Sequence, residues 1–271
     1  MRKKMLLIAV VLVVVSLCGS SAFGIAPVGP PTASLKTGQW STGFDYAHGE
    51  IDFEIDWSSD TAGVIPTYLS KESSAKDMES DAYLAKFGYG ISDDWELYGF
   101  LGAANNKGDI EDEGSIANGS VNFDGGHNFS GGFGTKWTFL KDEQASWGIV
   151  YQMSWSSGDD SYDDVDLTGL GGSSAETVDV DIDSFDITLM VGPTYEMGNW
   201  RIYGGAGLYY YDADIDVEAM NTTAVEGDVD EAMFGGYVGT EVDIDESCSF
   251  YGEYMLANDA WAIGTGIVWR F

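Results

Sequence analysis

The chain has 271 residues and a formal net charge of −33, from 45 acidic and 12 basic residues. A nucleic-acid-binding protein uses Lys and Arg to neutralise phosphates, so this charge excludes that class of function. Gly and aromatic residues are abundant, which is typical of strands, turns and the aromatic belts of membrane β-barrels. No run of about 18 or more apolar residues is present, which excludes a bundle of membrane-spanning helices.

The N-terminus is typical of a secretory signal peptide. Basic residues at positions 2–4 precede an apolar run over 5–17, and Ala22-Phe23-Gly24 fits a cleavage site of small residues. We therefore predict a signal peptide over 1–24 and export of the rest of the chain.

The residues after the predicted cleavage site divide into a leader and a barrel. Residues 25–37 contain Pro27, Pro30 and Pro31, which break regular structure, and we predict a periplasmic N-terminal leader there. Residues 38–271 form the predicted barrel domain. Removal of the signal peptide leaves one cysteine, Cys248, so an intramolecular disulfide is excluded.

From residue 38 onward, segments of about ten residues alternate apolar side chains with small or polar ones, as membrane-barrel strands do. The clearest segment is 184–197, in which the odd positions are apolar or aromatic. In chain order, the predicted strands cover 38–57, 81–91, 95–104, 128–139, 147–156, 179–197, 200–217, 231–243, 248–257 and 260–271.

Short and long connections alternate along these segments, as in outer-membrane barrels with short periplasmic turns and long external loops. We predict an all-β, transmembrane, antiparallel up-and-down β-barrel of ten strands. In the first segment the apolar positions change parity between Tyr46 and Ile51, which we interpret as a bulge at Gly49. A hairpin there would give twelve strands, and eight is the other alternative. The predicted turns are 92–94, 140–146, 198–199, 244–247 and 258–259, and the predicted long loops are 58–80, 105–127, 157–178 and 218–230.

Charged residues occupy several positions that the alternation assigns to the lumen. Because buried charges must be paired or hydrated, they either fill a narrow barrel or line a pore. A ten-stranded barrel is only slightly wider than an eight-stranded one, whose side chains just fill it, so we predict a mostly filled lumen. The inward charges are Lys86, Lys136, Arg201, Arg270, Asp45, Glu96, Asp186, Glu196 and Glu253.

Two acidic runs, 178–185 and 212–218, are the most unusual feature of the sequence. If the Gly198-Asn199 turn pairs Met197 with Trp200, acids lie directly opposite acids on the outer face, which destabilises a sheet. A divalent cation would offset the repulsion, since carboxylates are preferred Ca²⁺ ligands; screening by salt is the alternative. The proposed low-affinity Ca²⁺ or Mg²⁺ ligands at the external rim are Asp179, Asp181, Asp183, Asp214, Asp216 and Glu218.

The candidate catalytic residues do not form a known barrel-enzyme pattern. Neither His48 nor His127 has an aspartate at the spacing of the omptin-like proteases. A barrel lipase needs Ser and His on one face, but His127 and Ser130 are three apart and face opposite sides of a strand. We therefore predict no catalytic site and no cofactor.

The chain ends in GTGIVWRF, with Gly266, Trp269 and the terminal Phe271. This ending resembles the C-terminal β-signal of bacterial outer-membrane proteins, although Gly264 stands where that pattern begins with a polar residue. The mature chain is similar to small porin-like or OmpA-transmembrane-like barrels. The resemblance implies an outer-membrane location and recognition of Gly266, Trp269 and Phe271 by the barrel assembly machinery.

These features predict a non-enzymatic outer-membrane barrel with long acidic extracellular loops and a structural or surface-interaction role. A narrow, cation-preferring pore for small solutes is the first alternative, and a lipid-modifying or proteolytic barrel is the second. The expected partners are outer-membrane lipid, lipopolysaccharide and the barrel assembly machinery, with no nucleic acid. The sequence leaves the oligomeric state open.

Overall fold

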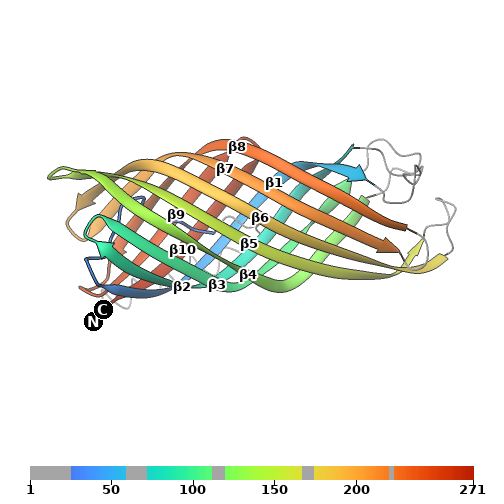
Figure 1. The fold of residues 1–271 in the computed structure, drawn as a ribbon, viewed down its shortest axis with the longest axis horizontal. Helices are drawn as coiled ribbons and strands as arrows, with labels where there is room; N and C mark the ends of the chain where they lie inside the picture. The colour runs from blue at the N-terminus through green and yellow to red at the C-terminus, as the bar shows by residue number, and fades with distance from the viewer. Residues whose placement is uncertain (1–25, 59–71, 112–119, 167–173, 220–222) are drawn as a thin grey trace, which may run out of the picture.

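The computed structural model describes residues 26–58, 72–111, 120–166, 174–219 and 223–271. They form an all-β fold in which ten strands close into an antiparallel barrel, as predicted (Figure 1). No helix among the described residues is long and apolar enough to cross a membrane. The strands are β1 (Trp40–Ser58), β2 (Glu72–Ser92), β3 (Trp95–Glu111), β4 (Ser120–Lys141), β5 (Ala145–Asp166), β6 (Ser174–Met197), β7 (Trp200–Ala219), β8 (Thr223–Asp243), β9 (Cys248–Ala257) and β10 (Ala260–Arg270).

The seam between the first and last strands closes the barrel. β1 and β10 pair without interruption from Ser41 opposite Arg270 to Ile51 opposite Ala260. Trp40 and Phe271 extend the seam, because each backbone N–H donates to the other residue's carbonyl, at 3.1 and 2.9 Å. The carboxyl end therefore lies at the short-turn end of the barrel (Figure 1).

Several strands are longer than the sequence predicted. The predicted long loops are wrong in much of their extent, because strands continue through them. The prediction depends on segments whose apolar side chains face outward, and this pattern stops before the strands do. The residues that belong to strands instead of loops are 58, 72–80, 105–111, 120–127, 157–166, 174–178, 218–219 and 223–230.

Along β6, β7 and β8 the apolar side chains change from the outer face to the inner face. Toward the short turns, Leu208 and Phe234 point outward, with exposed fractions of 53% and 60%. Toward the other end, Ile182, Ile215 and Val229 are buried inside the barrel. The strand pairing is continuous across this level, so no bulge causes the change. We call the part near the short turns the lower part and the other end the upper part. The outer surface of the lower part is therefore apolar, as contact with lipid requires. The upper part has a polar outer surface, as contact with water requires, and an apolar interior.

The predicted bulge at Gly49 is wrong, because in β1 too the apolar side chains change from the outer face to the inner face. Asp45, Ala47, Ile51 and Phe53 are all buried on the inner face, and β1 pairs evenly with β10 through Gly49. The parity change in the sequence marks the level at which the apolar face turns inward. A register shift does occur in β1, but against β2 and between Ile51 and Phe53.

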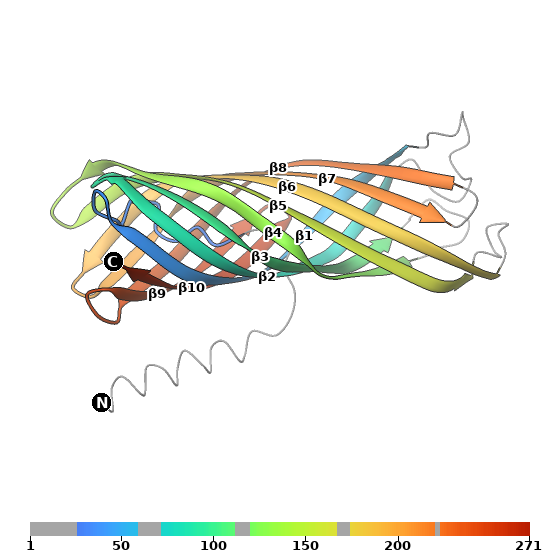
Figure 2. The same cartoon turned by 60° about the horizontal axis from the view of Figure 1, so that its bottom comes forward.

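The upper part of the barrel has eight strands instead of ten. β9 and β10 end at a short hairpin, whereas β5 to β8 run on to the far end (Figure 2). Beyond the hairpin β1 pairs directly with β8, with Asp56 opposite Asp228 and Ser58 opposite Glu226. Side chains just fill the interior of an eight-stranded barrel, so this narrowing favours a closed upper lumen.

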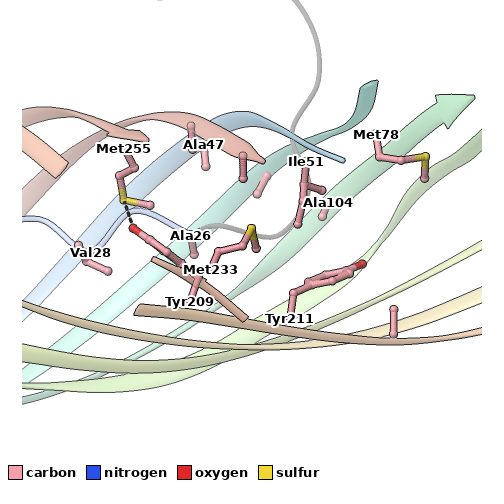
Figure 3. Packing of buried hydrophobic residues seen from close by; sticks show 14 of the residues in the cluster. Ala26, Val28, Ala47, Ile51, Met78, Ala104, Tyr209, Tyr211, Met233 and Met255 are labelled. Carbon is pink, nitrogen blue, oxygen red and sulfur yellow. Dashed lines mark hydrogen bonds between the residues drawn. The ribbon is translucent and has the colours of Figure 1, made fainter. Parts of the chain in front are cut away.

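Apolar side chains fill the interior around this level (Figure 3). The Tyr209 hydroxyl lies 3.3 Å from the sulfur of Met255, and the Met233 side chain lies close by in the same cluster. Farther up, Ile55 and Met78 are fully buried. Among the described residues, the interior at this level is therefore packed with buried apolar side chains.

Candidate functional site

The N-terminal residues 26–38, which we call the inner segment, run along the lower lumen: residues 26–35 lie inside it, and residues 36–38 are exposed at the short-turn rim. This placement corrects the prediction of a periplasmic leader over 25–37; residue 25 lies outside the described residues. The Glu253 carboxylate accepts the backbone N–H of Val28 and of Gly29, each at 2.8 Å. The Gln152 side-chain amide donates to the Ala26 carbonyl at 2.9 Å. The segment's polar backbone is thus satisfied by side chains of the barrel wall.

A second carboxylate holds the other end of the inner segment. Glu96 accepts the backbone N–H of Ser34 at 2.9 Å and of Leu35 at 3.3 Å. At the β2–β3 turn, Asp93 accepts the backbone N–H and the hydroxyl of Thr37, at 2.9 and 2.8 Å. These two bonds from Thr37 lower the pKa of the Asp93 carboxyl. The inner segment is therefore fixed from the middle of the lumen to the short-turn rim.

The wall leaves room for this segment at inward-facing glycines. A Cβ atom on Gly148 would lie 2.4 Å from the carbonyl oxygen of Pro31, and one on Gly264 would lie 2.7 Å from the Pro27 ring. Any side chain at either position would displace the segment. The sequence alone gave no sign that these glycines face an internal strand of chain.

Four of the nine predicted inward charges form ion pairs in the lower lumen. The Lys86 ammonium lies 3.0 Å from the Asp45 carboxylate and donates to the Pro27 carbonyl. The Glu241 carboxylate, which the sequence did not predict, forms an ion pair with the Arg201 guanidinium at 3.1 Å and another with Arg270. Such pairing is what a filled lumen requires.

Three other predicted inward charges lie outside these pairs. Lys136 is buried and faces the ring of Tyr98 at 5.5 Å, directly across from Glu96. Asp186 accepts a hydrogen bond from Ser154 on the neighbouring strand. Glu196 is exposed at the short-turn rim and was wrongly assigned to the interior, because the strand reaches water there.

The acidic residues of β6 and β7 lie opposite one another in the predicted register, because Met197 pairs with Trp200. Their described side chains are exposed on the outer face, beyond the level at which apolar residues turn inward. The side chain of Glu218 lies outside the described residues. The opposed residues are Asp183 with Asp214, Asp181 with Asp216 and Asp179 with Glu218.

Neighbouring strands extend these pairs into a wider surface that we call the acidic band. The wall also places Asp159 opposite Asp181, Asp228 opposite Asp214, and Asp56 opposite Asp228. In the described part of the chain, no three acidic, His or Cys side chains are close enough to hold a metal ion together. The band is defined as Asp56, Asp159, Asp179, Asp181, Asp183, Asp212, Asp214, Asp216, Asp228 and Asp230.

Asp214 lies at the centre of the acidic band. Partial desolvation raises the pKa of its carboxyl, and the charges of Asp212 and Asp228 raise it further. Repulsion within the band is therefore a cost to the folded state that the rest of the barrel offsets.

The last strand carries the residues of the predicted assembly signal. Trp269 and Phe271 point outward with exposed fractions of 42% and 74%. Gly266 faces inward, where a Cβ atom would lie 2.4 Å from the Tyr251 ring. Exposed tryptophans from other strands stand at the same end and form the aromatic belt of a membrane barrel: Trp40, Trp95, Trp137, Trp147 and Trp200.

One histidine has an acidic neighbour that the sequence analysis missed. His48 lies opposite Asp81 on β2, and the Nδ1 atom is 3.9 Å from the carboxylate. The Tyr46 hydroxyl donates to the same carboxylate at 2.7 Å, and the imidazole packs edge-on against Trp261. The β1–β2 register could have revealed this pair. His127 is exposed and Ser130 is buried, as expected for opposite faces.

The family model of the outer membrane protein beta-barrel domain matches residues 113–271, more than half of the chain. No curated protein matches the chain. Among solved structures, the chain is similar to the outer membrane protein OprG from Pseudomonas aeruginosa. The identity is 13% with a TM-score of 0.44, over 87% of this chain and 97% of that one.

Two further solved structures are similar to the chain. The outer membrane protease OmpT from Escherichia coli is 9% identical with a TM-score of 0.47, over 85% of this chain and 97% of that one. The attachment invasion locus protein Ail of Yersinia pestis is 12% identical with a TM-score of 0.32, over 87% and 99%. At these identities the likeness concerns the barrel fold alone.

Proposed function

Because the chain belongs to the outer membrane protein beta-barrel family, we propose that it is a non-enzymatic, non-conducting barrel that acts through its acidic band. The observation that carries this proposal is the change of faces along β6, β7 and β8. It gives the upper part an apolar interior and an acidic exterior. A pore needs a wet lumen along its whole length, whereas a surface for contact needs only a rigid stalk.

Two obstructions in series support a closed lumen. The inner segment occupies the lower lumen, where Glu253 and Glu96 bind its backbone. The upper lumen is filled by buried side chains such as Phe53, Ile55 and Ile215. The rival function, a narrow cation-preferring pore, would require both obstructions to be removed.

Planar-bilayer recordings separate the two functions. We expect the purified barrel to give no conductance steps. A variant that lacks residues 27–37 should also stay closed, because the apolar core remains, and heat-shifted migration on gels reports whether it has folded. Steady, cation-selective steps from the intact barrel would overturn the proposal in favour of a pore.

Cysteine labelling tests the placement of the acidic band beyond the bilayer. An impermeant maleimide applied to intact cells should label Asp181→Cys but not Ile182→Cys, because adjacent residues face opposite sides of the wall. Leu189→Cys, in the lipid-facing part, should also stay unlabelled. The native Cys248 is buried, so the background is low. Equal labelling of Asp181→Cys and Ile182→Cys would contradict the proposed closed stalk.

A further inference from the structure

The Asp186 carboxylate lies on the inner face of β6 without a charged partner. It accepts a hydrogen bond from the Ser154 hydroxyl, whereas its Oδ1 atom is buried and accepts none from the described residues. The residues directly opposite Asp186 are Ser154 on β5 and Tyr211 on β7, and neither is a cation. The ion pairs found in the described part of the chain do not include Asp186. A carboxylate enclosed in this way is costly to ionise unless a positive charge approaches it.

The carboxylates of the lower lumen show what Asp186 lacks. Asp45 pairs with Lys86, and Glu241 pairs with two arginines. Two more accept backbone N–H groups of the inner segment. Each of these four carboxylates is thus matched by a cation or by backbone donors, whereas Asp186 receives one hydroxyl group.

Ala26, the first described residue of the inner segment, lies just below Asp186. The Ala26 carbonyl accepts the Gln152 side-chain amide at 2.9 Å. Gln152 is one inward position below Ser154 on β5, and Asp186 lies opposite Ser154. Two residues of a strand span roughly 7 Å. Figure 3 shows Ala26 farther than Val28 toward the upper part, so the inner segment advances from the rim toward the level of Asp186.

The predicted signal-peptide cleavage creates an amine one residue before Ala26. Hydrolysis of the peptide bond between Gly24 and Ile25 consumes one water and leaves a carboxylate on Gly24. The Ile25 nitrogen becomes a primary amine, which is largely protonated at neutral pH. In the precursor the same nitrogen belongs to an uncharged amide. Cleavage therefore supplies a positive charge that the uncleaved chain lacks at this position.

We propose that the Asp186 carboxylate binds the N-terminal ammonium that cleavage creates at Ile25. One residue spans about 3.8 Å between Cα atoms, and the Asp186 side chain supplies the remaining reach. The ion pair fixes the upper end of the inner segment, as Glu253 and Glu96 fix the rest of it. Since the precursor cannot form this pair, cleavage completes the closure of the lower lumen. The inference depends on the predicted cleavage site and not on the acidic band.

Titration of the N-terminal amine tests the ion pair. The barrel is purified from outer membranes, and its intact mass should correspond to a chain that begins at Ile25; any other first residue would overturn the proposal. The unfolded chain is then labelled by reductive methylation with ¹³C, which keeps the charge of every amine, and refolded in detergent micelles for NMR. Because a bound carboxylate favours the protonated amine, we expect a titration midpoint about one pH unit higher than in Asp186→Asn, a tenfold change in proton affinity.

The matched control for this titration is Asp183→Asn, on the outer face of the same strand. It removes one negative charge from β6 but none from the lumen, so its N-terminal amine should titrate as in the native barrel. Equal midpoints in the native barrel and in Asp186→Asn would overturn the proposal.

Moving the ammonium tests whether the two groups act on each other directly. A chain with Gly-Ser placed before Ile25 keeps an N-terminal ammonium but displaces it from Asp186. Urea unfolding compares the native chain, Asp186→Asn, the extended chain and the chain with both changes. We expect Asp186→Asn to destabilise the native chain and not the extended one, because groups in contact have non-additive effects. Additive effects would contradict the pair.

Zero-length crosslinking of the native barrel needs no variant to fold. A carbodiimide joins a carboxylate to an amine in contact with it as an amide, and the water lost is taken up by the reagent. Peptide mapping should find the Ile25 nitrogen joined to Asp186. The pair of Lys86 and Asp45, at 3.0 Å, is the internal control. An Ile25 amine joined to another carboxylate, or left free while the control pair is joined, would overturn the proposal.

Discussion

At the scale of single residues, the acidic band contains aspartates whose negative charges repel one another in the folded barrel. Asp183 stands opposite Asp214, and Asp214 also stands opposite Asp228. Like charges directly opposite in a sheet destabilise it, and their exposure to water and salt limits the cost. Each acid also keeps the outer face wet, which an apolar side chain would not do.

Asp214→Asn should stabilise the barrel at neutral pH and low salt, by roughly 0.2–1 kcal/mol for a relieved like-charge contact. The raised pKa of Asp214 means that the folded state binds this proton more tightly than the unfolded chain. Stability therefore falls as pH rises from the unfolded pKa through the folded one, and Asn should remove this dependence. Urea titrations at several pH values measure it. Glu196→Gln is the control, because Glu196 lies opposite Arg201 and should not gain stability.

Calcium ions should act on the same acids. We expect millimolar Ca²⁺ to raise the melting temperature of the purified barrel, because a divalent cation relieves repulsion between opposed carboxylates. The effect should weaken in a variant with Asn at positions 181, 183, 214 and 216. If Ca²⁺ leaves the melting temperature of the native barrel unchanged, screening by monovalent salt is the correct account.

At the scale of elements, the inner segment and the last strand each depend on a few hydrogen bonds. Among the described residues, the inner segment meets a strand by a backbone hydrogen bond at Gly38, whose N–H donates to the Gly90 carbonyl of β2. Farther in, carboxylates replace the carbonyls that a neighbouring strand would offer. Glu253 also accepts the Tyr203 hydroxyl at 3.1 Å, which fixes the carboxylate in place. The last strand is held by β9 on one side and by the seam with β1 on the other.

Glu253→Gln should loosen the inner segment. An amide offers one acceptor and presents N–H groups toward a backbone N–H, so one buried donor loses its partner, at about 1–3 kcal/mol. We expect faster proteolysis of the N-terminal residues in the otherwise intact barrel, followed by mass spectrometry. Glu143→Gln, at an exposed turn, is the control and should leave cleavage unchanged.

Deletion of Phe271 should reduce the yield of assembled barrel in the outer membrane. It removes the terminal ring and also the two backbone hydrogen bonds with Trp40 that extend the seam. Phe271→Ala separates these effects, because it keeps the backbone bonds and removes the ring. An equal loss in both variants assigns the effect to the ring. Normal yield of the deletion variant would count against the assembly signal.

At the scale of the whole molecule, the barrel has two parts that distribute apolar and charged side chains in opposite ways between the inner and outer faces. The lower part has apolar side chains outside and paired charges inside, and the upper part has acids outside and apolar side chains inside. Strands β1 to β8 run through both parts, so the upper part continues the wall of the lower one, whereas β9 and β10 belong to the lower part (Figure 2).

Truncation of one apolar residue in each part should have unequal effects. Ile215→Ala should destabilise the barrel by about 2–5 kcal/mol, because it opens a cavity in the buried upper core. Leu208→Ala, on the outer face, leaves no cavity inside and should cost much less. Urea unfolding in detergent micelles, followed by tryptophan fluorescence, compares them. Equal costs would mean that the upper interior is not a packed core.

The sequence by itself determined the fold class, the number of strands and the β6–β7 register. Alternation with a period of two assigns each residue to a face, and a two-residue turn at Gly198-Asn199 fixes the pairing that follows. The facing acids on these strands followed from the same two facts. These features are local, so they can be derived from neighbouring residues.

Only the tertiary structure decided which face of each strand meets water along the length of the barrel, where the inner segment lies, and which distant strands pair. Alternation does not distinguish apolar residues that face lipid from apolar residues that face a core, so β1 gave a false bulge at Gly49. The contacts of Glu253 with Val28 and of Lys86 with Asp45 join distant parts of the chain. The direct pairing of β1 with β8 depends on how early β9 and β10 end, which is a property of the closed barrel and of no single segment.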